Sequence, residues 1–507
     1  MTATTAIERT DTRRPGRFAS LRPALDIDLS RAPAVLLLAL AYIASRAPFI
    51  DNGFGTKPDA WRIALTDYWL WDHGELYPSR LPGYPVPELA YATVIKGGWI
   101  ATNSLTVAVS LLGVWFFARI VRELKLPAPA LLVAGFAFNP LLWINSMNTM
   151  DYTWALTLIM GAYYFLLIDR TMIAALLLGL AVGSRIPSAS FIVPYSFYLW
   201  RSGRRAQIPA FAATVAAVAA VAFAPIIWTY HLRFLNFYDA KIGYRDVFRL
   251  LTKDALGLAG SAALAVACLV SWRRLARIPA DAVQDKNVAV WTIAIVLVSA
   301  TFFRLPHEAA YLMPLFPFAF LLIGRYLHPA ALAAALVVIV GAGFVDLTTA
   351  THQVTLGELR HMRVGQGMLL SNRDTQSAQL AYARDIEHTS FPENSVVMIG
   401  FVYPQFAVLN RDRLDLGILE KDRTSISQLT DKGRAVDTAD GVTYVWLLDY
   451  ADFQRFRGQG ATVYYTPDAG RSTAALYNFR PGLFGAQVIE SGRAPGGGAD
   501  TAGRNQR

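Results

Sequence analysis

Long apolar stretches separated by short polar turns run through most of the chain. The first covers residues 33–50, and ten more follow at about 103–121, 129–147, 152–168, 171–184, 186–200, 207–230, 256–272, 288–304, 308–325 and 329–348. A helix that crosses a bilayer needs roughly 20 apolar residues, and about 17 suffice. The pattern therefore predicts a polytopic α-helical membrane protein with roughly eleven spans. Arg185 and Pro187 interrupt the short pair at 171–184 and 186–200, which predicts a hairpin of incomplete helices.

From about residue 350 the pattern changes to that of a water-soluble domain. Short apolar or β-branched runs at 395–400, 442–448 and 462–465 alternate with helical patterns at 375–388, 425–433, 450–457 and 473–477. Strands that alternate with helices predict a small α/β layer. We therefore divide the chain into a basic tail at 1–31, a transmembrane domain at 32–349, an α/β domain at 350–491 and a disordered tail at 492–507.

Composition and charge support this division. The chain is 54% apolar and only 17% charged, which is too apolar for an ordinary soluble protein. The net charge of +10 does not indicate a nucleic-acid partner, because the basic residues bunch at the ends of apolar segments. If the N-terminus is inside and the spans alternate, nearly every basic cluster falls on the inner side. These clusters lie at 119–127, 169–170, 201–205, 273–287 and 325–328.

The orientation follows from that charge pattern. Basic residues precede the first apolar stretch, and no cleavage-site pattern follows it, so we read residues 33–50 as a retained first span. The N-terminus is then cytoplasmic, and the loop at 51–102 and the α/β domain are periplasmic or extracellular. We expect a multi-pass protein of a bacterial inner membrane, with the lipid bilayer as its surroundings.

The outer loop carries the first candidate for chemistry. It contains Pro58-Asp59-Ala60-Trp61-Arg62, in which Asp59 could deprotonate an acceptor hydroxyl as a general base while Arg62 favours its ionised form. A structural role for Asp59 stays open as the alternative, because an acid directly after a proline is also typical of a helix start.

Three further outer segments hold ionisable residues. Arg80 and Glu88 lie in SRLPGYPVPE, where prolines and a glycine favour a rigid path and a guanidinium could grip a phosphate. Arg185 in GSRIP could do the same or could reach lipid headgroups. Asp151 in NTMDYTW precedes a span, where a helix-capping acid is the favoured interpretation.

The last outer segment is RLPHEAAYLMPLFP, which contains Arg304, His307, Glu308 and Tyr311. A cation here could bind the phosphate of a lipid carrier, with Tyr311 one helical turn deeper. Ionisable groups at membrane depth cost about 2.5–3.5 kcal/mol each, so several on one side predict a single polar site. No second histidine lies at a ligand spacing, and Cys268 is the one cysteine, so neither a metal nor another cofactor is indicated.

Together these segments resemble the GT-C superfamily of integral-membrane glycosyltransferases. The resemblance is to members that use polyprenyl-phosphate sugars, such as protein O-mannosyltransferases and the aminoarabinose transferase of lipid A. It rests on PDAWR, SRLPGYPVPE, NTMDYTWA, GSRIP and RLPHEAAYLMPLFP, followed by an outer α/β domain. The chain departs from many members in lacking a paired acidic motif, since Asp51 and Asp67 stand eight residues to either side of Asp59.

The resemblance implies an inverting transfer of a sugar from a polyprenyl-phosphate donor to a glycan, lipid or protein acceptor of the cell envelope. Asp59 would be the base. The implied donor-binding residues are Arg80, Arg185, Arg304, His307 and Tyr311, and the supporting residues are Arg62, Glu88, Asp151 and Glu308. Two alternatives stay open. One is a transporter or flippase of lipid-linked sugars, and the other is a glycan ligase or polymerase that uses pyrophosphate-linked donors.

Overall fold

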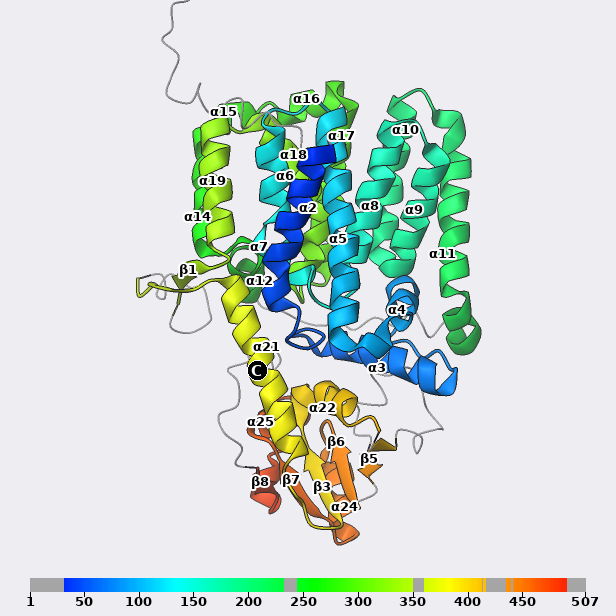
Figure 1. Ribbon diagram of the computed structural model, residues 1–507, viewed down its shortest axis with the longest axis vertical. Coiled ribbons are helices and arrows are strands. Elements are labelled where there is room, and N and C mark those ends of the chain that lie inside the picture. Colours follow the sequence, from blue (N-terminus) through cyan, green and yellow to red (C-terminus); the bar gives the residue numbers. More distant parts are fainter. Residues whose placement is uncertain are drawn as a thin grey trace, which may run out of the picture.

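A computed structural model describes residues 32–231, 244–349, 360–412, 414–415, 435–438 and 441–489. A bundle of apolar helices fills one end of the molecule, a small α/β layer fills the other, and a helix lies across the boundary between them (Figure 1). The predicted tails at 1–31 and 492–507 and the predicted helix at 425–433 lie outside the described residues.

The bundle is built from helices that match the apolar stretches of the sequence. Its long members are α2 (Ala32–Arg46), α5 (Gly98–Glu123), α8 (Tyr152–Leu167), α9 (Thr171–Ser184), α10 (Ile192–Arg201), α11 (Ile208–Tyr230), α14 (Leu258–Val270), α17 (Lys286–Arg304), α18 (Phe316–Tyr326) and α19 (Pro329–Gly341). Shorter pieces connect them, namely α6 (Pro129–Ala137), α7 (Pro140–Asn145), α12 (Tyr244–Leu251), α13 (Lys253–Leu256), α15 (Trp272–Leu275) and α16 (Ile278–Gln284). The 3-10 turns η3 (Ile186–Phe191) and η6 (Ala309–Leu315) precede α10 and α18.

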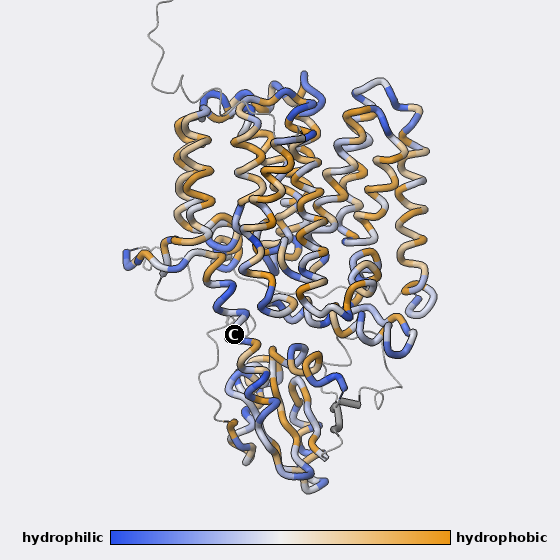
Figure 2. The backbone as a smooth tube through the Cα atoms, in the orientation of Figure 1, coloured by the Kyte–Doolittle hydropathy of each residue, from blue (hydrophilic) through white to orange (hydrophobic). Residues whose placement is uncertain are grey.

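Four helical stretches of the described chain are long and apolar enough to cross a membrane: Ile95–Glu123, Arg205–Tyr230, Lys286–Arg304 and Ala309–Tyr326. A fifth arises if the bent pair Asp246–Leu256 and Leu258–Val270 forms one span. Hydrophobic residues dominate the middle of the bundle, and polar residues gather toward its two ends (Figure 2). The protein is thus mostly helical with spans of membrane length, while the count of roughly eleven stays a prediction.

Two predicted spans end earlier than the apolar pattern suggested. The stretch at 129–147 is broken between α6 and α7, because the Asn139 side chain accepts hydrogen bonds from Leu141 N and Leu142 N and Pro140 opens the new helix. The stretch at 329–348 is helical only to Gly341, and its last residues form β1 (Val345–Thr348). β1 pairs antiparallel with β2 (Arg363–Gln366).

The outer loop at 51–102 is largely helical. It contains α3 (Pro58–His73), α4 (Pro85–Ala92) and the 3-10 turn η2 (Ile95–Gly97). Pro58 is at the start of α3, and Gly74 ends it in a left-handed conformation with its N–H bonded to Leu70 O. α3, which has Asp59 in its first turn, lies across the end of the bundle (Figure 1).

The α/β layer begins with α21 (Met368–Glu387), which leads from the bundle to the sheet (Figure 1). The six strands are β4 (Leu414–Asp415), β5 (Ala435–Thr438), β6 (Val442–Val445), β3 (Ser395–Met398), β7 (Thr462–Tyr465) and β8 (Gln487–Val488), in that order across the sheet. β3 is central and runs parallel to β6 and β7, which pair with it on either side. The helices of the layer are α22 (Tyr403–Leu409), α24 (Tyr450–Gly458) and α25 (Pro467–Tyr477), with 3-10 turns at Gly400–Val402 and Pro481–Phe484.

Contacts at α22 and just after it attach this layer to the outer loop. α22 packs against α3, and the Arg411 guanidinium lies 4.1 Å from the centre of the Tyr68 ring. The sheet is thus held next to the helix that carries Asp59. The predicted strands at 395–400, 442–448 and 462–465 are found as β3, β6 and β7, the first two being shorter than expected.

Candidate active site

Segments that lie far apart in the sequence meet at the end of the bundle that α3 crosses. Asp59 and Arg62 come from the first turns of α3, and Arg80 comes from the loop before α4. Asp151 directly precedes α8, Arg185 directly follows α9, and Glu308 and Tyr311 come from the start of η6. The structure therefore brings together seven of the ten residues singled out from the sequence.

Asp59 lies between two guanidinium groups. Arg62 Nη1 is 2.6 Å from Asp59 Oδ1, and Arg80 Nε is 3.1 Å from Asp59 Oδ2. Burial by itself would raise the pKa of the Asp59 carboxyl, but Arg80 and Arg62 outweigh burial and hold the pKa below its ordinary value. Asp59 is therefore ionised at neutral pH, and its side chain is still 22% exposed.

Asp151 extends this chain of charges into the protein. Its side chain is fully buried, its Oδ1 is 3.1 Å from Arg80 Nη2, and its Oδ2 is bonded to Arg185 Nη1. Asp151 occupies the residue before α8, but its side chain makes no capping hydrogen bond there. Asp151 is thus at the predicted helix start, but its carboxylate bonds two arginines and not the backbone N–H groups of α8.

Three guanidinium groups gather around two carboxylates. Arg62 and Arg80 contact Asp59, and Arg80 and Arg185 contact Asp151. Arg80 Nη1 is buried and has no hydrogen-bond partner within the described part of the chain. An unpaired buried donor is costly, so this nitrogen is suited to an anionic or hydroxyl ligand.

Tyrosine rings pack against the guanidinium groups. Arg80 Cζ lies 4.2 Å from the centre of the Tyr84 ring, and Arg185 Cζ lies 4.3 Å from the Tyr152 ring and 4.9 Å from the Tyr311 ring. Such cation–π contacts fix the planes of the two guanidinium groups. Tyr84 and Tyr152 were not singled out in the sequence, although both lie inside the segments that carry the resemblance.

A second ion pair borders the first chain. Glu308 Oε1 is 3.6 Å from Lys57 Nζ, and Glu308 Oε2 accepts a hydrogen bond from the Tyr152 hydroxyl at 3.0 Å. Lys57 immediately precedes α3 and was not singled out in the sequence either. Glu308 therefore joins η6 to the start of α3 and to α8.

Arg304 and His307 stand at the edge of this arrangement. Both are exposed, and Arg304 is the last residue of α17. Although His307 reaches solvent, the protein around its imidazole partly desolvates the ring and lowers its pKa. The nearby Glu308 carboxylate opposes that shift without reversing it, so at neutral pH the imidazole is mostly neutral. The cations that form the chain of ion pairs are instead Arg80 and Arg185.

Glu88 holds the loop that carries Arg80 and Tyr84. Its side chain is buried, and its Oε1 accepts hydrogen bonds from Ser79 N at 2.9 Å and from Ser79 Oγ at 2.6 Å. Its Oε2 accepts a longer bond from Tyr84 N at 3.3 Å. One carboxylate thus joins the two ends of the segment 79–84, which fixes where Arg80 lies relative to Asp59.

The segment before α3 is held from several sides. Gly53 O accepts hydrogen bonds from Asn103 Nδ2 at 2.9 Å and from Gln376 Nε2 at 3.2 Å, and Gln376 belongs to α21. Gly53 has a φ of +98°, and a Cβ at this position would lie 2.6 Å from the Trp61 ring. This backbone path requires glycine, and it places Pro58 and Asp59 at the mouth of the site.

Replacing Gly53 with alanine should lower the stability of the protein by about 1–3 kcal/mol and reduce its activity, because the new methyl group clashes with Trp61 and the backbone is strained. The matched control is Gly74→Ala. Gly74 also has a positive φ, but a Cβ there meets nothing within 4 Å. Thermal unfolding of both variants in detergent would separate strain from steric clash, and equal losses would contradict a clash with Trp61.

Asp67 and Asp51 do not join Asp59. Asp51 accepts a hydrogen bond from Trp99 Nε1, whereas Asp67 is fully buried and neither carboxylate oxygen has a hydrogen-bond partner among the described residues. Burial raises the pKa of Asp67 well above its ordinary value, and the nearby Glu88 carboxylate adds to that shift. A second acid is therefore buried in α3, but it forms no ion pair with the arginines that contact Asp59.

The raised pKa of Asp67 predicts a pH-dependent stability. An acid whose pKa is raised by folding stabilises the protein fully below its unfolded pKa of about 4, and this contribution is lost as the pH rises through the folded pKa. Asp67→Asn removes that loss, so the melting temperature of the variant relative to wild type should be higher at pH 8 than at pH 5. The control is Asp72→Asn on the same helix, which should show the same melting-temperature difference from wild type at both pH values. If Asp67→Asn behaves like this control, the predicted pH dependence is wrong.

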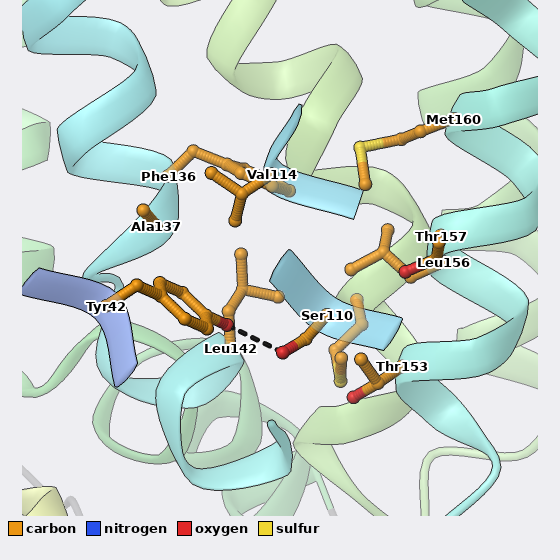
Figure 3. Close-up of a pocket in the computed structure, with 11 residues that line it drawn as sticks. Tyr42, Ser110, Val114, Phe136, Ala137, Leu142, Thr153, Leu156, Thr157 and Met160 are labelled. Carbon is orange, nitrogen blue, oxygen red and sulfur yellow. Dashed lines mark hydrogen bonds between the residues drawn. The ribbon is translucent and has the colours of Figure 1, made fainter. Parts of the chain in front are cut away.

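The bundle also contains a small internal cavity that is separate from this site. Figure 3 shows its lining, in which the Tyr42 hydroxyl donates a hydrogen bond to Ser110 Oγ at 2.8 Å and most other side chains are apolar. Its volume is about 20 Å³, which is room for roughly one water molecule. The cavity therefore cannot take a sugar or a lipid chain.

No group of three or more His, Cys, Asp or Glu side chains in the described ranges is arranged to hold a metal ion. The residues gathered at the site are guanidinium, carboxylate and phenol groups. This set is suited to binding an anion and to moving a proton.

Comparison with known proteins gives little beyond these observations. No family model matches the chain, and no curated protein matches it. Among solved structures, the crystal structure of ArnT from Cupriavidus metallidurans in the apo state is similar, with a TM-score of 0.43 and 14% sequence identity. The match covers 57% of this chain and 58% of that chain. A likeness at this level carries no statement about the activity of this protein.

Proposed function

We propose that this protein is a membrane glycosyltransferase that transfers a sugar from a polyprenyl-phosphate donor to an acceptor hydroxyl, with inversion at the anomeric carbon. The observation that carries the proposal is the ionised, partly exposed Asp59 in contact with Arg80, whose buried Nη1 has no hydrogen-bond partner among the described residues, at the polar end of an apolar bundle. A carboxylate base and a phosphate-binding cation pair are the two groups that such a transfer needs.

The proposed reaction has one chemical step. The acceptor oxygen forms a bond to the anomeric carbon while the bond from that carbon to the phosphate oxygen breaks. The hydroxyl proton passes to the Asp59 carboxylate, and polyprenyl phosphate leaves with the electron pair of the broken bond. Arg80 and Arg185 lie where they could meet the developing phosphate charge, and no metal ion is required for that role.

The surrounding residues position these groups. Asp151 holds Arg80 and Arg185 at a fixed separation, and Glu88 fixes the loop that carries Arg80. The rings of Tyr311 and Tyr152 lie against Arg185 and restrict how its planar guanidinium can turn. In this proposal Arg62 and Glu308 are supporting residues, and Arg304 and His307 serve the donor only at the rim.

The site would face the periplasm, and the acceptor would be a glycan, a lipid or a protein of the cell envelope. This orientation rests on the distribution of basic residues. One example is α15, which contains Arg273 and Arg274 and lies at the end of the bundle away from α3 (Figure 1). The lipid chain of the donor would lie along the apolar helices.

The proposal is tested with purified protein in nanodiscs, a panel of polyprenyl-phosphate sugars and a membrane extract as acceptor. The expected result is release of free polyprenyl phosphate from one donor, dependent on added acceptor. Pyrophosphate-linked sugars form a parallel arm, and release from these alone would identify a ligase or polymerase instead. No release from any donor, together with movement of a lipid-linked sugar across vesicles, would identify a transporter.

A further inference from the structure

A surface pocket lies at the end of the bundle opposite α3. Helices α10, α16 and α17 meet there (Figure 1), and the pocket has a volume of about 500 Å³. Its lining consists of Arg201, Gln284, Asp285, Lys286 and Asn287. None of these residues belongs to the chain of ion pairs near Asp59, so the pocket is independent of the proposed reaction.

The two cations of the pocket retain unused hydrogen-bond donors. Arg201 uses Nη2 to donate to the carbonyl oxygens of Val283 and Gln284, at 2.8 and 3.2 Å. Lys286 Nζ donates to Ser202 Oγ at 2.9 Å and lies 4.7 Å from the Tyr198 ring. These contacts hold both side chains in place, while an ammonium has three N–H donors and a guanidinium has five.

The one carboxylate in the lining is already paired. Asp285 accepts a hydrogen bond from Asn287 N at 2.8 Å as the cap of α17, and it forms an ion pair with Arg325. The pocket therefore presents a net positive charge, and α17 directs its N-terminal end toward it.

The neighbourhood of the pocket is that of a membrane boundary. Arg201 is the last residue of α10 and Lys286 is the first of α17, and both helices are apolar beyond these residues. Trp200 is 54% exposed and stands next to Arg201, as an aromatic residue at a headgroup level does. A ligand in the pocket would have its polar part between the cations and its apolar part along α10 or α17.

We propose that this pocket binds a phosphate-bearing anion, and that the ligand is the headgroup of an anionic phospholipid. Arg201 and Lys286 donate to the phosphate oxygens, and the acyl chains lie against the apolar helices. Basic residues at this end also act as a topology signal, but a topology signal needs neither a pocket nor donors that converge in it. The proposal does not depend on the activity assigned to Asp59.

The test is native mass spectrometry of the full-length protein in detergent, titrated with phosphatidylglycerol or phosphatidylcholine of equal chain length. Phosphatidylglycerol should bind the wild type. Its affinity for an Arg201→Gln/Lys286→Gln variant should be lower by about tenfold or more. The control Arg273→Gln/Arg277→Gln removes the same charge from exposed positions at the same end and should bind as the wild type does. Lys286→Arg keeps the charge and should retain binding.

Two outcomes of the lipid titrations would overturn the proposal, and a phosphate competition adds a third. One is an equal loss in the pocket variant and the control variant, which would reduce the effect to general electrostatics. The other is equal binding of the two lipids by the wild type. A third arm adds inorganic phosphate alone. Full displacement of phosphatidylglycerol at millimolar phosphate would assign the pocket to a soluble phosphate and contradict the phospholipid as its ligand. Melting temperatures without lipid show whether each variant is folded.

Discussion

Replacing Asp59 with asparagine should reduce the rate of polyprenyl phosphate release by about 10²–10⁴-fold, which is the usual contribution of a positioned general base. The amide keeps the size of the side chain and can still accept a hydrogen bond from Arg62 or Arg80, but it cannot take the acceptor proton. The measurement is the initial rate with the best donor from the panel, at saturating donor and acceptor.

The matched control is Asp72→Asn, since Asp72 lies on the same helix and is exposed. This variant should retain the wild-type rate. The KM for the donor should not rise in Asp59→Asn, because removing a negative charge beside the guanidinium groups does not weaken phosphate binding. A wild-type rate in Asp59→Asn, at equal expression and melting temperature, would remove Asp59 from the role of base.

Replacing Asp151 with asparagine should cost about 3–5 kcal/mol of stability, because breaking a buried ion pair from one side leaves an uncompensated charge. Two guanidinium groups depend on this fully buried carboxylate, so Arg80 and Arg185 would repel each other across an uncharged amide. Activity should fall as well, since Arg80 would lose its fixed place beside Asp59. The measurement is thermal unfolding in detergent, followed by the release assay on the folded fraction.

Asp169→Asn provides the contrast. Asp169 also pairs with an arginine, Arg204, but its side chain is 79% exposed. Water screens such a pair, so the loss should be less than about 1 kcal/mol. If the two variants melt at the same temperature, the buried pair contributes no more than a surface pair, and Asp151 would have no special part in holding the site together.

The periodicity of the sequence was enough to predict most of the helices. Apolar stretches such as 152–168 and 171–184 reappear as α8 and α9 almost without change, and β7 has the predicted bounds. Whether a helix is buried among apolar surroundings depends mainly on the apolar residues in its own stretch of sequence, so it can be recognised without the tertiary structure. One error falls where a local capping signal overrides the apolar pattern, at Asn139 and Pro140 in the stretch 129–147. Another falls in the stretch 329–348, whose last residues pair with β2 as a strand.

The candidate site was predictable only as a set of residues on one side of the bundle. Charges at the outer ends of spans are expensive, which is why the sequence could indicate that Asp59, Arg80 and Arg185 converge. It could not indicate that Asp151 is the carboxylate that joins Arg80 to Arg185, because a helix cap and an ion-pair partner have the same local sequence. Lys57, Tyr84 and Tyr152 were missed for the same reason, since nothing in their neighbours distinguishes them.

By itself the sequence determined that this is a helical membrane protein with an α/β layer after the last span and ionisable residues grouped at one end of the spans. These features follow from hydrophobic periodicity and charge, which act over a few residues. Only the tertiary structure decided which charges pair, that burial raises the pKa of Asp67, and that α21 of the α/β layer holds the Gly53 segment before Asp59. Such pairings depend on distances between segments that are separated in the sequence, and those distances are fixed by packing.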